Sequence, residues 1–268
     1  MIVDTIKIPC RHGETIKIRP ISDVHCGNVW ADMKLFKKHV QGIDDMTYIL
    51  GVGDWFDLII PSDLKRYRKS GDATSSDDAI NCVVEEMADI IEPKINQILG
   101  LGIGNHEDSI IKHCSFNPIR ALCDKFNIRQ LGYSFLLRII LYDAVHNGHG
   151  RSIYIFGHHG WGGGGRTEGA DLTKFWRHAK GFEADIYLYG HVHKKQDDHR
   201  MRLAMNGKEV ITKPKYLIIC GTYQKTLSNT TDTTHAESKG FEPTALGCYE
   251  IELTVTNKWL DVDVHAVK

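Results

Sequence analysis

The stretch Thr15-Ile16-Lys17-Ile18-Arg19-Pro20-Ile21-Ser22-Asp23-Val24-His25 joins an alternating pattern of apolar and polar residues to an aspartate and a histidine. Alternation of this kind predicts a β-strand over residues 14–22. Asp23 and His25 then lie just beyond the carboxyl end of that strand. Because ligands in layered α/β proteins bind outside the carboxyl ends of the strands, this stretch predicts both a strand and a site at its end.

The same order of strand, polar motif and helix recurs along the first half of the chain. An amphipathic helix is expected over residues 33–40, and the apolar run 48–52 predicts a buried strand that ends at Asp54. Residues 77–99 have the longest helical pattern, which Pro93 should kink or restart. This alternation predicts a layered α/β protein.

The second half of the chain is expected to be rich in strands. Residues 99–103 predict a weak strand before this part of the chain, and further strand patterns occur at residues 133–142, 152–156, 185–189, 200–212, 216–220 and 246–255. Asn206-Gly207 predicts a hairpin turn. Two poorly patterned segments, residues 61–76 and 224–244, are expected to be long loops.

Length and composition limit the class of protein. A chain of 268 residues commonly forms one α/β domain, so a single domain over residues 1–268 is expected. The 33 basic and 34 acidic residues nearly balance, so charge does not indicate a nucleic-acid partner. Seven scattered cysteines without a C-x-x-C pair suggest neither disulfides nor a zinc knuckle, and favour the cytoplasm. No apolar run approaches about 18 residues, so no membrane partner is expected.

Five short polar motifs occur in an order that one active site could use. They are Asp23-Val24-His25, Gly53-Asp54-Trp55-Phe56-Asp57, Gly104-Asn105-His106-Glu107, Gly157-His158-His159-Gly160 and Gly190-His191-Val192-His193. Carboxylate, amide and imidazole ligands suit manganese, iron or zinc, and the lack of cysteine in all five motifs argues against a closed structural zinc site. Two divalent cations about 3.5–4 Å apart can clamp a transferring phosphoryl group and activate a water at neutral pH.

These motifs resemble those of the calcineurin-like metallophosphoesterase superfamily, which follow the pattern D-x-H, GD-x-x-D, GNH-[DE], H and GH-x-H. The resemblance covers residues 18–195. The tail motifs Gly221-Thr222-Tyr223, Lys239-Gly240-Phe241-Glu242-Pro243 and Leu246-Gly247 are similar to phage and prophage members, as is the glycine run 162–165. The resemblance implies a four-layer αββα sandwich, in which two facing mixed sheets are flanked by helices.

The resemblance also implies a role for each motif. One metal would be bound by Asp23, His25, Asp54 and His193, and the other by Asp54, Asn105, a central histidine and His191, with Asp54 as the bridge. His158 is favoured over His159 as the central histidine. His106 would protonate or stabilise the leaving oxygen, and Asp57 would orient its ring. Two divalent ions are implied, with manganese favoured over iron, zinc or nickel.

The reaction expected is hydrolysis of a phosphodiester, such as a nucleotide or cyclic nucleotide, by attack of a hydroxide that bridges the two metals. The alternatives are a DNA nuclease, a phosphomonoesterase, and a non-catalytic interaction protein on the same fold. Leu58 and Ile59 follow Asp57 where protein phosphatases carry GD-x-x-DRG, which weighs against that class. The basic run 65–69 could guide a nucleic acid, although a solvated surface is the more common role.

Overall fold

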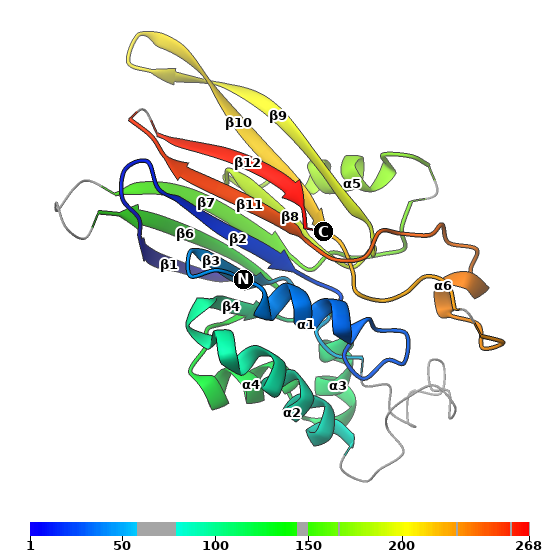
Figure 1. The fold of residues 1–268 in the computed structure, drawn as a ribbon. Helices are drawn as coiled ribbons and strands as arrows, with labels where there is room; N and C mark the ends of the chain where they lie inside the picture. Colours follow the sequence, from blue (N-terminus) through cyan, green and yellow to red (C-terminus); the bar gives the residue numbers. More distant parts are fainter. Residues whose placement is uncertain (58–78, 144–149, 166, 229, 258, 268) are drawn as a thin grey trace.

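The computed structural model of the chain describes residues 1–57, 79–143, 150–165, 167–228, 230–257 and 259–267. Within these ranges the chain forms two six-stranded sheets, each with both parallel and antiparallel pairs (Figure 1). The first sheet has the strand order β1-β6-β7-β8-β10-β9, and the second has the order β12-β11-β2-β3-β4-β5. The two sheets face each other as the central layers of the molecule.

The strands of the first sheet are β1 (Ile2–Pro9), β6 (Ser134–Tyr142), β7 (Arg151–His158), β8 (Ile186–Tyr189), β10 (Glu209–Cys220) and β9 (Lys195–Asn206). Those of the second are β12 (Leu260–Ala266), β11 (Tyr249–Val255), β2 (Thr15–Ile21), β3 (Thr47–Gly51), β4 (Ile98–Gly102) and β5 (Gln130–Gly132). The helices are α1 (Met33–Gln41), α2 (Ala79–Ile91), α3 (Asn105–Cys114), α4 (Pro118–Phe126), α5 (Ala170–Ala179) and the short α6 (His235–Ser238), with a 3-10 helix, η1, over Glu92–Gln97.

The main core lies between the two sheets. Alternate side chains of β6, including Leu137 and Ile139, are fully buried there against Ile18 of β2 and Ile251 of β11. Ile18 and Ile251 are also direct cross-strand partners. Successive strand residues point to opposite faces, so the alternation seen in the sequence is what gives each sheet one face for this core.

Helices cover the outer face of each sheet. Phe36 and Val40 of α1 and Met87 of α2 pack against the second sheet, together with residues of α4. Phe175 and Trp176 of α5 pack against the first sheet. The order helix, sheet, sheet, helix confirms the expected four-layer α/β sandwich (Figure 1).

The sequence pattern predicts neither β1, β5 nor β12, and all three are edge strands. Edge strands often carry charged residues that discourage pairing with other molecules. In β12, for example, Asp261 and Asp263 interrupt the apolar residues. Their weaker apolar signal follows from their position in the sheet.

The hairpin β9–β10 differs from its prediction in two details. The turn residues are Gly207 and Lys208, one position later than predicted, and Gly207 has a left-handed φ of 61°. β10 also continues through Pro214, where two separate strands were expected. Pro214 pairs with β9 alone, because β8 joins β10 only from Tyr216 onward, and a proline is tolerated where a strand has one neighbour.

The helical predictions are confirmed in outline. Of the helix expected over residues 77–99, positions 79–97 form α2 and then η1, with Pro93 at the start of η1. Residues 98 and 99 instead begin β4, and residues 77 and 78 lie outside the described ranges. Residues 224–244 are largely loop with the short α6, whereas residues 61–76 lie outside the described ranges. No helix in the described part of the chain is long and apolar enough to cross a membrane.

We expect Leu137→Ala to lower the free energy of unfolding by about 2–5 kcal/mol, because it leaves a cavity in the core between the sheets. Val3→Ala on the neighbouring β1, where the side chain is 67% exposed, is the control and should stay within about 0.5 kcal/mol of wild type. Urea denaturation measures both. Equal effects of the two substitutions would contradict the assignment of the core.

Candidate metal centre

All five polar motifs meet at the carboxyl ends of strands from both sheets. Asp23 and His25 follow β2, Asp54 follows β3, Asn105 begins α3 after β4, His159 follows β7, and His191 and His193 follow β8. β2, β3 and β4 are parallel neighbours in one sheet, and β7 and β8 are parallel neighbours in the other. The parallel arrangement therefore brings motifs that are far apart in the chain to one place.

The backbone at this place adopts an uncommon conformation. Five of the candidate ligands have φ between 52° and 73°, namely Asp23, His25, Asp54, His191 and His193. The other non-glycine residues with positive φ in the described ranges, Ser115 and Asn127, are helix C-caps. Residues in this conformation cost about 1–3 kcal/mol each and gather at functional sites. Because five such residues gather here, the backbone at this place accepts a conformational cost that fixes the directions of the ligand side chains.

Asp23, His25 and His193 form one ligand group at this place, here called the Asp23 cluster. The Nε2 atoms of His25 and His193 lie 2.9 Å apart, and His193 Nε2 lies 3.2 Å from the Asp23 carboxylate. Burial and the other histidines lower the pKa of His25, whose Nδ1 is buried without a hydrogen-bond partner among the described residues. Two imidazole nitrogens and a carboxylate therefore point to one small volume.

Asp54, His159 and His191 form a second group, here called the Asp54 cluster. His159 Nε2 lies 3.1 Å from an Asp54 carboxylate oxygen, and the Asn105 Oδ1 lies between the rings, 3.1 Å from His159 Nε2 and 2.6 Å from His191 Nδ1. Burial disfavours the charged form of His159, but Asp54 outweighs burial and raises the pKa of His159 to about 9. Asp54, Asn105, His159 and His191 therefore direct their donor atoms to one small volume.

The structure groups His159, and not the favoured His158, with Asp54 and His191. His159 is fully buried, and its Nδ1 lies 3.1 Å from the carbonyl of Val52, which directs Nε2 toward Asp54. His158 is the last residue of β7 and points the other way, so that its Nδ1 accepts a hydrogen bond from Gly160 and its ring contacts Trp161. Adjacent strand residues face opposite sides, and the register at the end of β7 selects His159.

Asp57 and His106 are paired as expected. His106 Nδ1 lies 2.7 Å from Asp57 Oδ1, and the backbone N–H of His106 donates to Asp54. Burial alone would raise the pKa of Asp57, but His106 outweighs it and holds that pKa well below its usual range. Asn28, which lies outside the five motifs, also contributes, because its side-chain amide donates to the second oxygen of Asp57 at 2.6 Å. The carboxylate is therefore held from both sides.

Glu107 is a second residue whose role was not predicted from the sequence. Its fully buried carboxylate accepts backbone N–H groups from Gly104, Asp54 and Phe56 at 2.7, 3.1 and 2.9 Å. Burial and the nearby Asp54 raise its pKa to about 7. Glutamate three residues after a helix N-cap is a capping-box signal, which could have identified it. Glu107 fixes the loop after β3 to the start of α3.

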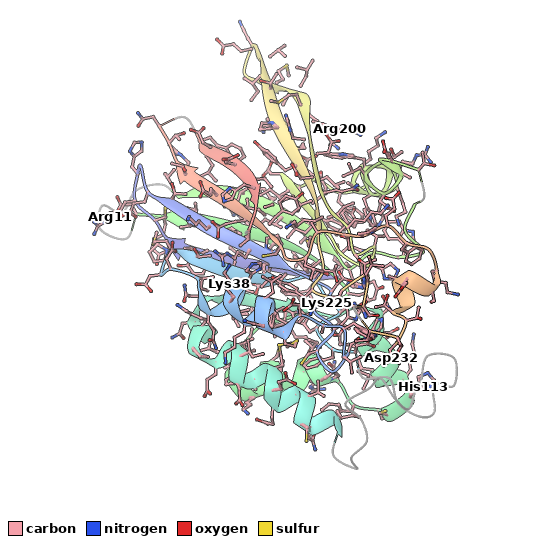
Figure 2. All side chains as sticks on the ribbon, turned by 45° about the vertical axis from the view of Figure 1, so that its right-hand side comes forward. Arg11, Lys38, His113, Arg200, Lys225 and Asp232 are labelled. Carbon is pink, nitrogen blue, oxygen red and sulfur yellow. The ribbon has the colours of Figure 1, made fainter. Side chains whose placement is uncertain are left out.

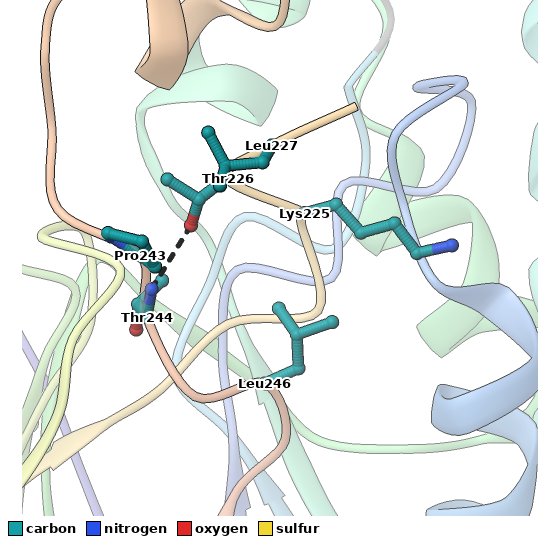
Figure 3. A pocket seen from close by; sticks show the side chains of 6 residues that line it. All are labelled: Lys225, Thr226, Leu227, Pro243, Thr244 and Leu246. Atoms are coloured by element: carbon teal, nitrogen blue, oxygen red, sulfur yellow. Dashed lines mark hydrogen bonds between the residues drawn. The ribbon is translucent and has the colours of Figure 1, made fainter. Parts of the chain in front are cut away.

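The loop 224–244 borders the site on one side. The hydroxyl of Thr244 donates to the carbonyl of His193 at 2.8 Å, and its backbone N–H donates to Thr226. Both threonines line a pocket of about 220 Å³ together with Lys225, Leu227, Pro243 and Leu246 (Figure 3). Thr244 therefore places the end of this loop beside His193. Arg166 and the basic run 65–69 lie outside the described ranges.

The two clusters fit divalent cations. Each brings at least three nitrogen or oxygen donors to within 4.8 Å of one another on mostly buried side chains. Such convergence is unfavourable without a bound charge, because imidazole lone pairs and carboxylates repel one another in a low-dielectric site. A mixed set of imidazole, carboxylate and amide donors suits manganese, iron, nickel or zinc.

Comparisons with known proteins give structural likeness at low sequence identity. No protein-family model matches the chain, and no curated protein matches its sequence. Among solved structures, a predicted phosphoesterase of Streptococcus pneumoniae is 14% identical, with a TM-score of 0.34 over 94% of this chain and 90% of that one. Vps29 of Chaetomium thermophilum is 12% identical, with a TM-score of 0.40 over 94% and 97% of the two chains. A metallophosphoesterase of Sphaerobacter thermophilus is 12% identical, with a TM-score of 0.37 over 94% and 89%. What this chain does is therefore inferred from its own side chains.

Proposed function

We propose that this chain is a metal-dependent phosphoesterase that uses two divalent cations, with manganese the preferred ion. The observation that supports it best is the pair of adjacent ligand groups, the Asp23 cluster and the Asp54 cluster, beside the His106–Asp57 pair. Asp23, His25 and His193 would hold one cation, and Asp54, Asn105, His159 and His191 the other, with Asp54 shared. Cations bound there would polarise a phosphoryl oxygen and lower the pKa of a water molecule.

The remaining chemistry belongs to His106. The Nδ1–H of the ring donates a hydrogen bond to Asp57, and this leaves Nε2 to face the substrate. From Nε2 a proton can pass to the oxygen that leaves phosphorus, as general acid catalysis requires. The ring is 19% exposed, whereas Asp57 is buried, so only the histidine is accessible to a substrate. We propose a phosphodiester as substrate, with nucleotides and cyclic nucleotides as the first candidates.

We expect His106→Ala to lower kcat for bis-p-nitrophenyl phosphate by about 10²–10⁴-fold, because the leaving oxygen loses its proton donor. The metal content should not change. The assay uses metal-stripped protein refilled with manganese, and inductively coupled plasma mass spectrometry measures the metal. His113→Ala, an exposed histidine of the same helix, is the matched control and should behave as wild type.

The same assay with p-nitrophenyl phosphate separates the substrate classes. Turnover of the monoester alone would replace the diesterase proposal by a phosphatase. Bound metal without turnover of either compound would favour a binding role for the fold.

We expect Asp54→Asn to reduce metal occupancy and turnover together, since Asp54 would serve both cations and a neutral amide is a weaker ligand. Asp124→Asn, a 74% exposed aspartate of α4, is the control and should change neither. Isothermal titration with manganese measures occupancy. Full activity in Asp54→Asn would rule out its role as a shared ligand.

The two central histidines should differ in their effect on metal binding. We expect His159→Ala to remove one of two manganese ions per chain, because His159 Nε2 lies beside Asp54 and Asn105. His158→Ala should keep both ions, since its ring points to Trp161. Metal stoichiometry after dialysis distinguishes them. If His158→Ala loses an ion and His159→Ala does not, His158 is the metal ligand instead.

A further inference from the structure

The hairpin β9–β10 extends beyond the sheet to which it belongs. β8 pairs with β10 only over Tyr216 to Ile219, whereas β10 pairs with β9 from Glu209 to Cys220. Residues 200–206 and 209–215 therefore pair only with each other in the described part of the chain. Figure 1 and Figure 2 show this ribbon projecting from the body of the molecule, with Arg200 labelled on it in Figure 2. An isolated two-stranded hairpin is at best marginally stable in water.

One face of the projecting hairpin is apolar and exposed. The register places Met201 opposite Pro214, Leu203 opposite Thr212, and Met205 opposite Val210. Directly opposed residues of an antiparallel pair share a face, so these six residues form what is here called the hairpin face. Its large side chains are exposed, Met201 by 63%, Leu203 by 75%, Met205 by 82% and Val210 by 73%.

The hairpin face continues the core side of the first sheet. Tyr216 packs against the core between the sheets and its hydroxyl donates to the carbonyl of Val262 in β12, and Ile218 lies within that core. Because side chains alternate along a strand, Val210 and Pro214 point to the same side as Tyr216 and Ile218. At this hairpin the first sheet thus extends beyond the second sheet. The hairpin face is the part of its core side that the second sheet does not cover.

The opposite face of the hairpin already has partners. Lys215 is buried and pairs with Glu183 at 2.8 Å and Asp185 at 3.1 Å, and Arg202 lies 3.9 Å from Glu183. Lys215 and Arg202 therefore have acidic partners on the outer side. None of the six residues that form the hairpin face is charged.

We propose that a second copy of this chain covers the hairpin face, by face-to-face packing of the two hairpins about a twofold axis. A twofold contact uses the same surface patch on both molecules. A charged patch would therefore place like charges against each other, whereas the hairpin face has no charged residue. The four large side chains of the hairpin face are 63–82% exposed, and covering that face on two molecules buries on the order of 1,000 Å². That area is near the lower limit for a specific interface, so we expect a dimer with a Kd on the order of micromolar.

Sedimentation velocity of the full chain between about 1 and 100 µM tests this proposal. Wild type should shift from monomer to dimer over that range. Leu203→Lys, at the centre of the hairpin face, should remain a monomer throughout, because two lysines would meet across the axis. Hydrogen exchange of residues 199–215 should slow with increasing concentration in wild type but not in Leu203→Lys.

A matched pair of substitutions locates the interface. Val210→Lys on the hairpin face should abolish the dimer, whereas Val3→Lys on β1, the other edge strand of the same sheet, should leave it intact; the two valines are 73% and 67% exposed. Circular dichroism confirms that each variant is folded. A wild type that stays monomeric would overturn the proposal and assign the face to a different partner. A dimer that survives Leu203→Lys would overturn it as well, and so would a dimer that is lost in Val3→Lys.

Discussion

Four carboxyl groups are buried side by side where the two sheets meet. The groups that balance their negative charge determine the structure around them. Asp23, Asp54, Asp57 and Glu107 are each at most 2% exposed. Among the described residues their partners are imidazoles, backbone N–H groups, the Ser22 hydroxyl and the Asn28 amide, and no lysine or arginine forms an ion pair with them. Buried charge requires pairing, and histidines can offer it either as cations or as ligands that share a bound cation with the carboxylates. This is the physical reason why the site favours metal ions.

The loops that carry these groups are stabilised by hydrogen bonds to one another. The backbone N–H of Asp23 donates to Gly53, and those of Val24 and His25 donate to Asp54. Across the sheets, the N–H of His191 donates to both oxygens of Asp23 at 2.9 and 3.1 Å. These bonds offset the cost of the left-handed conformations at the same residues. Hydrogen bonds between loops of both sheets therefore fix the positions of the ligand groups.

One strand, β10, connects the site with the hairpin face. Its carboxyl end leads into Thr222, whose hydroxyl donates to the carbonyl of Asp23 at 2.9 Å. Its amino end forms the projecting hairpin, a full strand length away from that point. A second copy packed on the hairpin face would thus leave the mouth of the metal centre open to substrate.

The sequence by itself determined the layered α/β class and most candidate ligands. Alternation in residues 15–21 and the polar residues that follow were sufficient, because strand periodicity and motif order are local properties of the chain. The choice between His158 and His159 required the tertiary structure, since the register at the end of β7 decides which ring faces Asp54. The roles of Asn28 and Glu107 also required it, because their partners Asp57 and Asp54 are distant in the chain. The same is true of the exposed hairpin face, because whether a strand face is covered depends on the length of the opposing sheet and not on the strand's own residues.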